Sequence, residues 1–316
     1  MTGNIVRGVA IAAVAAAIAL LPFTLSDYNR SQGADVAVFF MAILGLNIVT
    51  GYTGQISIGH GAFMAIGGYA TAILTHDHGW NDLSTLPIAA AAGFGAGVVV
   101  GLPALRFRGT YLALATFAVA LAVPQIAKNY SGFTGGTEGL ALPFHSGLWL
   151  YGVGWTAAAV LFVLAWLLLR ARTGRGFRAV RDSEVAAASS GVSLAVYKTL
   201  AFGVSAAFAA VAGSIYVLVN NFINPDVFGL TLSLYILIGA VVGGLGSLWG
   251  VLAGAAFIQL LPIGLTSSHA VSSQSVPVVF GAIVIIVMAL IPRGAADLLR
   301  AAVALFARRS QGAPTP

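Results

Sequence analysis

Long apolar runs separated by short polar connections constrain this sequence more than any other feature. A membrane-spanning helix needs about 20 mostly apolar residues, and the chain of 316 residues holds about ten runs near that length. They lie at roughly 8–25, 34–50, 56–75, 86–105, 110–128, 148–169, 194–219, 230–245, 248–266 and 276–292. The runs predict an all-α integral membrane protein with about ten transmembrane helices, in one domain spanning 1–316. We expect the first run to be a retained helix rather than a cleaved signal peptide.

The composition argues against a water-soluble globular fold. Only 8% of the residues are charged and 59% are hydrophobic, with a mean hydropathy of +0.96. Soluble domains carry about 25% charged residues. A soluble fold of this composition would have too little polar surface to cover itself, so we expect the chain to lie in a lipid bilayer.

The net charge of +6 indicates membrane orientation rather than nucleic-acid binding. With the N-terminus inside, only Arg30 and Lys128 fall on the outer side, which leaves 13 of the 15 basic residues on the inner side. The positive-inside rule therefore predicts that both termini are cytosolic. No basic run carries the interleaved aromatic residues of a single-strand binder, so no nucleic-acid partner is expected.

Several kinds of chemistry lack the residues they need. The chain has no cysteine, and its two lysines, Lys128 and Lys198, do not follow a glycine, so it cannot form a Walker A loop for ATP. The five histidines are scattered, and we expect no metal site and no catalytic residue. The sequence therefore predicts no cofactor bound by this chain and no enzymatic activity of its own.

The segment TGYTGQISIGHG, residues 50–61, interrupts the apolar pattern with glycines and uncharged polar residues. Irregular backbone survives at membrane depth only where protein or a water-filled cavity covers it. We therefore expect the segment to face other protein or a polar path. The candidate substrate-path residues are Tyr52, Thr53, Gln55, Ser57 and His60, and the candidate helix-packing residues are Gly51, Gly54 and Gly59.

A second glycine-rich segment, GAVVGGLGSLWGVLAGAAF at 239–257, lies in the other half of the chain. Its four-residue spacing lets helices pack backbone to backbone, with Gly243, Gly246, Gly250 and Gly254 as candidates. Paired glycine-interrupted segments in the two halves of a transporter also indicate the substrate path. Pathway and packing both remain open for these segments. The same spacing at Gly93, Gly97 and Gly101 lacks polar partners and favours packing alone.

The polar stretch 170–198 is the largest inner connection. Phe177, Val180 and Glu184 are spaced for a short helix, along which Arg178 could pair with Asp182 and Arg181 with Glu184. Ser189, Ser190 and Gly191 would end this helix, and Ser193 could cap the next one. A further segment, 294–309, predicts an amphipathic helix on the inner membrane surface.

Four motifs resemble one known family. RGFRAVRDSEVAAASSGVSLAVYKTLAF resembles the coupling loop of the permeases of ATP-binding-cassette (ABC) importers, specifically the branched-chain amino acid type with its LivM-like subunit. GYTGQISIGHGAFMAIGGY, TGGTEGL and GGLGSLWGVLAGAAF resemble that family's other motifs, in the same order. The resemblance covers roughly residues 35–295 and implies the ABC importer permease fold.

The resemblance implies a set of partners and roles. It implies a second homologous permease, two cytosolic ATP-binding subunits that hold ATP and Mg, and an extracytoplasmic solute-binding protein, in the bacterial cytoplasmic (inner) membrane. It implies coupling to the ATPase by Arg178, Arg181, Asp182, Glu184, Ala187 and Gly191. The transported solute would be a branched-chain amino acid or a related small polar molecule.

Two other classes of function remain open from the sequence. A stand-alone channel or facilitator for a small neutral solute such as urea would need no coupling loop, so residues 176–191 discriminate it from an importer subunit. A membrane enzyme is the weaker alternative, because no nucleophile or metal constellation is assembled.

Overall fold

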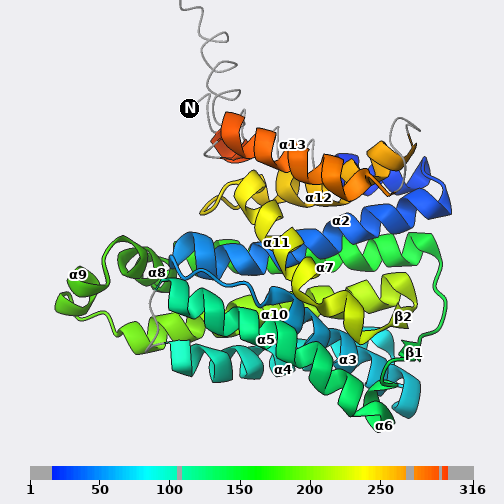
Figure 1. Cartoon of the computed structure of the whole chain (residues 1–316), viewed down its shortest axis with the longest axis horizontal. Helices are drawn as coiled ribbons and strands as arrows, with labels where there is room; N and C mark the ends of the chain where they lie inside the picture. The colour runs from blue at the N-terminus through cyan, green and yellow to red at the C-terminus, as the bar shows by residue number, and fades with distance from the viewer. Residues whose placement is uncertain (1–15, 105–108, 268–273, 292–293, 298–316) are drawn as a thin grey trace, which may run out of the picture.

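The computed structural model describes residues 16–104, 109–267, 274–291 and 294–297. Its long helices are α2 (Asp27–Leu46), α3 (His60–His78), α4 (Asp82–Ala104), α5 (Thr110–Asn129), α7 (Gly147–Arg170), α10 (Leu194–Asn220), α11 (Leu230–Gly243), α12 (Gly250–Ser267) and α13 (Val276–Leu290). Most of them run roughly along the long axis of the molecule, whereas α11 crosses it steeply (Figure 1). Residues 8–15 of the first predicted run, 8–25, lie outside the described residues, as do residues 298–309 of the predicted amphipathic segment 294–309.

Short elements join these helices. They are the 3-10 turns η1 (Leu21–Phe23) and η3 (Pro225–Phe228), the π-helical turn η2 (Asn47–Tyr52), the helices α6 (Ser131–Thr134), α8 (Arg172–Asp182) and α9 (Glu184–Ser189), and the strands β1 (Leu140–Ala141) and β2 (Phe222–Ile223). The two strands pair antiparallel, Leu140 with Ile223.

Six helices in the described part of the chain are long and apolar enough to cross a membrane. The first of them combines α2 with η2, and the others are α4, α5, α7, α10 and α12. The helices α11 and α13 are apolar but shorter. The all-α architecture is therefore as predicted, whereas the count of about ten crossings stays a prediction.

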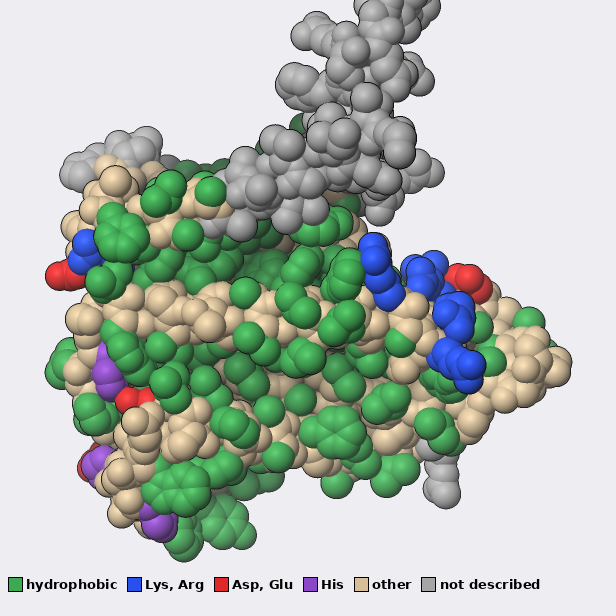
Figure 2. Space-filling view, turned by 180° about the vertical axis from the view of Figure 1, so that it is seen from behind, with side chains coloured by type: hydrophobic (Ala, Val, Ile, Leu, Met, Phe, Trp, Pro, Cys, Tyr) green, Lys and Arg blue, Asp and Glu red, His purple; other side chains and the backbone are tan. Residues whose placement is uncertain are grey.

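Opposite ends of the molecule carry different polar groups. We call the end that holds α8 and α9 the basic end, and the end that holds β1 and β2 the strand end (Figure 1). Lysine and arginine side chains gather at the basic end, and hydrophobic side chains cover the surface between the two ends (Figure 2). This distribution fits an apolar band between two wetted ends.

The helices α2 and α10 form the centre of the bundle. About 89% of the apolar window of the α2–η2 span and 83% of that of α10 are buried, against 28% for the other four spans. Residues such as Phe202, Ile43 and Leu218 are fully buried between these helices and their neighbours. Since α2 and α10 are enclosed by protein, polar side chains on them can be satisfied by other helices instead of lipid.

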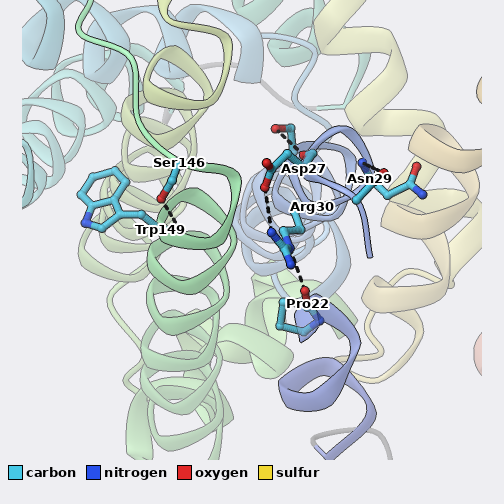
Figure 3. Close-up of polar contacts among 8 residues, drawn as sticks. Pro22, Asp27, Asn29, Arg30, Ser146 and Trp149 are labelled. Carbon is cyan, nitrogen blue, oxygen red and sulfur yellow. Dashed lines mark hydrogen bonds and ion pairs between the residues drawn. The ribbon is translucent and has the colours of Figure 1, made fainter. Parts of the chain in front are cut away.

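At the strand end, α2 and α7 begin side by side. Ser26 and Ser146 cap the two helices by accepting hydrogen bonds from the backbone N–H groups of Asn29 and Trp149. Arg30 pairs with Asp27 at 2.7 Å and donates to the carbonyl of Pro22 at 2.7 Å (Figure 3). The first two turns of α2 are thus polar and ordered, which explains why the helix begins seven residues before the predicted run at 34–50.

Small residues bring helix backbones into contact. A Cβ atom at Gly97 would lie 2.6 Å from the carbonyl oxygen of Phe202, so α4 packs closely on α10. A Cβ at Gly250 would overlap the carbonyl of Gly243, and one at Gly254 would overlap that of Gly239. The α11–α12 hairpin therefore has no space for side chains at these positions, which is the packing that the spacing predicts.

We expect Gly250→Leu to destabilise the helix bundle, because its side chain would separate α11 from α12. Overpacking of this kind costs about 1–3 kcal/mol or more. Thermal unfolding of the detergent-solubilised protein measures the effect. Gly264→Leu is the matched control, since Gly264 lies on the same helix with nothing within 4 Å of an added Cβ. Equal melting temperatures for the two variants would contradict the packing described here.

Candidate functional site

The break between α2 and α3 is the centre of the candidate site. After α2, the chain forms the wide turn η2 and then an extended segment, 53–59, before α3 begins at His60. Gly54 has a φ of 72°, a left-handed conformation that glycine adopts at little cost. His60 bonds to Ser205, which lies near the middle of α10, so α3 starts at mid-depth of the bundle. The predicted span 56–75 therefore begins with four non-helical residues, 56–59, and is helical from His60 onward.

Alternate side chains of the extended segment face opposite ways. Thr53, Gln55 and Ser57 are buried, whereas Gly54 and Ile56 are exposed. This alternation has the period of two expected of extended backbone. The polar side chains predicted for the path thus point into the protein, and the surface that the segment presents outward is glycine and isoleucine.

The buried polar side chains satisfy the irregular backbone. Thr50 donates to the carbonyl of Gln55 at 3.0 Å, and Thr53 donates to that of Val49. The Gln55 amide donates to the hydroxyl of Thr53 at 2.9 Å, while Tyr52 is itself buried within η2. These bonds replace the backbone hydrogen bonds that a continuous helix would make. They are needed because unpaired backbone groups are costly in an apolar surrounding.

His60 ties the start of α3 to the central helices. Its Nε2 lies 2.7 Å from the hydroxyl of Ser205, and its Nδ1 lies 3.2 Å from that of Ser57. Ser205 donates onward to the carbonyl of Gly45 on α2. Sequence analysis did not identify Ser205, because nothing in a serine on an apolar helix indicates a partner 145 residues away.

A second helix start meets the first. The chain enters from β2 through η3, and α11 begins at Leu230 without a side-chain cap. The backbone N–H of Gly61 donates to the hydroxyl of Ser233 in the first turn of α11 at 2.9 Å. A Cβ on Gly61 would lie 2.9 Å from the carbonyl of Phe228. The starts of α3 and α11 therefore lie against each other inside the bundle.

The two glycine-rich segments also meet at the basic end. The Asn47 side chain donates to the carbonyl of Ser247 at 2.8 Å and accepts from the N–H of Gly246 at 2.7 Å. Gly246 has a φ of 78°, and Gly51 packs on its backbone N–H. Asn47 thus joins the turn η2 to the α11–α12 loop. The sequence analysis identified both segments, but it did not predict their contact, and it missed Asn47, which lies just before the first segment.

Arg181 of α8 reaches into this junction. One of its guanidinium nitrogens donates to the carbonyl of Gly51 at 3.1 Å. A Cβ on Gly54 would lie 3.1 Å from the Arg181 side chain, and one on Gly246 would lie 3.3 Å from its guanidinium. A side chain at Gly54 or Gly246 would therefore crowd the arginine. One arginine contacts both glycine-rich segments at the point where the α2 span ends.

The polar stretch 170–198 folds into two helices rather than one. Ser183 separates α8 from α9 and caps α9 by accepting from the N–H of Ala186. Ser193 precedes α10 but makes no side-chain cap, contrary to our expectation. The break allows α9 to extend beyond the bundle at the basic end (Figure 1).

The predicted ion pairs in this stretch are wrong. Arg181 pairs with its neighbour Asp182 at 3.3 Å instead of with Glu184. Glu184 pairs with Lys198 at 2.6 Å, and the side chain of Lys198 is only 4% exposed. Arg178 turns back and donates to the carbonyls of Gly174 and Leu169. The helical spacing fails because Ser183 interrupts the helix, which changes the faces on which these side chains lie.

The remaining predicted coupling residues lie at the end of α8, on α9 and in the turn after α9. Ala187 is buried, whereas Asp182 is exposed and Gly191 forms the exposed turn after α9 with a φ of 79°. Val185 is 72% exposed and Val196 is 59% exposed, so apolar side chains also face outward here. The basic end therefore presents a surface with both charged and apolar groups.

In the described residues, no group of three or more metal-ligating side chains lies together.

A family model covers most of this chain. The model described as "Branched-chain amino acid transport system / permease component" matches residues 31–289. No solved structure matches the chain.

Curated relatives agree with that family. The high-affinity branched-chain amino acid transport system permease protein LivM of Salmonella typhimurium is 32% identical over 269 residues, which are 75% of this chain and 63% of the relative. LivM of Escherichia coli K12 is also 32% identical, over 74% of this chain and 63% of the relative. The permease protein LivH of Escherichia coli K12 is 27% identical, over 82% and 91%. The matches thus span less than two thirds of the length of the two LivM proteins.

We expect Glu184→Arg to destabilise the protein, because the ammonium of Lys198 would remain buried without its partner. The expected cost is on the order of 2 kcal/mol. The double variant Glu184→Lys with Lys198→Glu should recover part of that loss, since it restores opposite charges. Denaturant unfolding of Glu184→Lys, Lys198→Glu and the double variant gives the coupling energy. Strictly additive losses would show that the pair contributes nothing.

Proposed function

Because the chain belongs to the family of branched-chain amino acid transport system permease components, we propose that it is the membrane-spanning subunit of an ATP-driven importer. Its solute is a branched-chain amino acid or a related small polar molecule. The subunit forms part of the path and hydrolyses nothing itself. ATP and Mg are held by separate subunits, since the sequence has no Walker A loop.

The proposal includes specific partners. They are a second homologous permease, two cytosolic ATP-binding subunits and an extracytoplasmic solute-binding protein. The relatives LivM and LivH, both described as permease proteins of a branched-chain amino acid system, support a pair of related permeases. The surface of α9, with Glu184, Val185 and Gly191, is where we place the ATP-binding subunit.

The observation that carries the proposal is the contact of Arg181 with the break in the α2 span. The helix α8 packs on the end of the bundle through Phe177 and Val180, and its Arg181 donates to the carbonyl of Gly51. Asn47 continues this contact to the α11–α12 loop. Movement of α8 and α9 on a closing ATPase would therefore shift both glycine-rich segments together, which can convert nucleotide closure into alternating access.

We place the solute path along the outward face of the extended segment 53–59. Ile56 is 43% exposed on this face, and Gly54 beside it is exposed next to the Arg181 side chain. The buried Thr53, Gln55, Ser57 and His60 would line the path indirectly by holding the backbone in place. An apolar face of this kind suits a branched aliphatic side chain. Tight binding is not needed here, since the solute-binding protein would set the affinity.

We propose that the basic end faces the cytosol and the strand end faces outward, in the bacterial cytoplasmic membrane. The arginines of α8, together with Arg170 and Lys198, lie at the basic end. Cationic side chains remain on the cytoplasmic side during insertion. This orientation would bring the described C-terminal residues, near Gly244 and Gly250, to the cytosolic side.

The stand-alone facilitator for urea receives no support from the relatives described above, which are permeases of transport systems. A facilitator also has no need for an element like α8–α9, with an arginine inserted at the helix break.

We expect Arg181→Ala to uncouple transport from ATP hydrolysis. The charged hydrogen bond to Gly51 is worth about 1.5–3 kcal/mol, so leucine uptake per ATP hydrolysed should fall about tenfold. The measurement uses proteoliposomes with the whole complex and its loaded binding protein. Arg175→Ala is the matched control, because Arg175 is exposed on the same helix. An equal uptake-to-ATP ratio in both variants would exclude coupling through Arg181, and uptake by wild type without ATP would favour a facilitator.

The proposed orientation predicts opposite labelling of the two ends. Cysteines introduced singly at Glu138 and Ser190, in this chain without native cysteine, should react differently with a membrane-impermeant maleimide. In intact spheroplasts, only the cysteine at position 138 should be labelled, because its loop lies at the strand end. Labelling at position 190 before lysis would reverse the orientation.

A further inference from the structure

Asp35 is a half-buried acid that the proposed coupling does not use. It lies eight residues into α2, about 12 Å from the strand end of that helix. Among the described residues, it is the one acidic side chain placed away from the ends of a long helix. Acidic residues inside membrane spans are costly and mark ion or substrate pathways.

The carboxylate of Asp35 has few partners. Its Oδ1 atom is buried and accepts no hydrogen bond. Its Oδ2 atom has a long contact of 3.4 Å from the side-chain nitrogen of Gln259 on α12, and the side chain of Asn220 on α10 also hydrogen-bonds the carboxyl group. That same nitrogen makes its shorter bond, 2.7 Å, to the side-chain oxygen of Gln32. No lysine, arginine or histidine of the described chain pairs with this carboxylate.

An ionised carboxylate accepts up to about four hydrogen bonds, whereas an ammonium group donates three. The oxygens of Asp35 and Gln32 are both acceptors, and both lie beside the nitrogen of Gln259. A small group with one positive charge and several N–H donors matches this set. A neutral solute such as urea would leave the charge uncompensated in an apolar surrounding.

We propose that Asp35, with Gln32 and Gln259, binds the ammonium group of the transported amino acid during its passage. This inference rests on the proposed function, since it names the solute chemistry that the permease itself recognises. The side chain of Asp35 supplies the charge, and the two glutamines orient the group by hydrogen bonds.

The position of the three residues fits an entry site. They lie on the side of α2 that faces α12, towards the strand end. Further along the same side, Ile43 packs against Gly239 of α11, and Asn47 bonds to the α11–α12 loop. The contact between α2 and the α11–α12 hairpin thus connects the carboxylate with the junction that Arg181 touches. Solute released at the strand end would meet Asp35 first.

The first test is Asp35→Asn, which removes the charge but keeps an oxygen that can accept from Gln259. In proteoliposomes with the complete complex, uptake of radiolabelled leucine should fall at least tenfold, with the ATP-binding subunits still attached. Asp77→Asn is the control, because Asp77 is an exposed acid at the end of α3. Uptake by Asp35→Asn at the rate of the control would overturn the inference.

A second pair of variants separates ligand binding from a structural role. Gln259→Lys places a resident ammonium beside Asp35, so it should block uptake at least tenfold. Thr266→Lys adds a lysine at an exposed position of the same helix, away from Asp35, and should keep most of the uptake. If Asp35 only needs a partner to stabilise the bundle, Gln259→Lys would transport as well as Thr266→Lys, and the inference would be wrong. Absence of ATP-dependent leucine uptake in the wild-type complex would instead refute the proposed function, and this inference with it.

Discussion

Every backbone N–H and carbonyl group in an apolar surrounding needs a hydrogen-bond partner, and a broken helix supplies fewer of them than a continuous one. The break after α2 leaves such groups at mid-depth of the bundle. Thr50, Thr53 and the side chain of Thr116, which accepts from the N–H of Ile58, supply the missing partners. The helices α2 and α10 are the most enclosed in the structure because the break and its polar side chains must be kept away from lipid.

The same requirement brings distant parts of the chain together. The carbonyl of Gly51 is left free by the end of the helical ladder, and Arg181 occupies it from α8. Asn47 satisfies both kinds of backbone group in the α11–α12 loop, because its side chain accepts from the N–H of Gly246 and donates to the carbonyl of Ser247. The backbone groups of the break depend on donors and acceptors from other helices. When those helices move, they can therefore move the break with them. Broken helices therefore suit a protein that has to change shape within a membrane.

Hydropathy predicted most helices closely because burial in lipid depends on composition over many residues. The run at 110–128 corresponds to Thr110–Asn129, and the run at 194–219 to Leu194–Asn220. The sequence could not predict which face of 53–59 is buried, because glycines and small polar residues fit either side. It also could not predict that Lys198, inside an apolar helix, pairs with Glu184, since this depends on the break at Ser183.

The length of chain between bonded residues affects how this protein is made. The hydrogen-bond partner of His60 is Ser205, which lies 145 residues further along the chain. The partner of Asn47 is Ser247, which lies 200 residues further along. At a synthesis rate of about 5–20 residues per second, these partners emerge roughly 7–40 s after the break itself. During that interval the first half of the chain carries unsatisfied polar groups at membrane depth. The inserting chain must therefore remain beside water or the insertion machinery until α10 and the α11–α12 loop have been synthesised. The early helices can take their final positions only after these late segments are present.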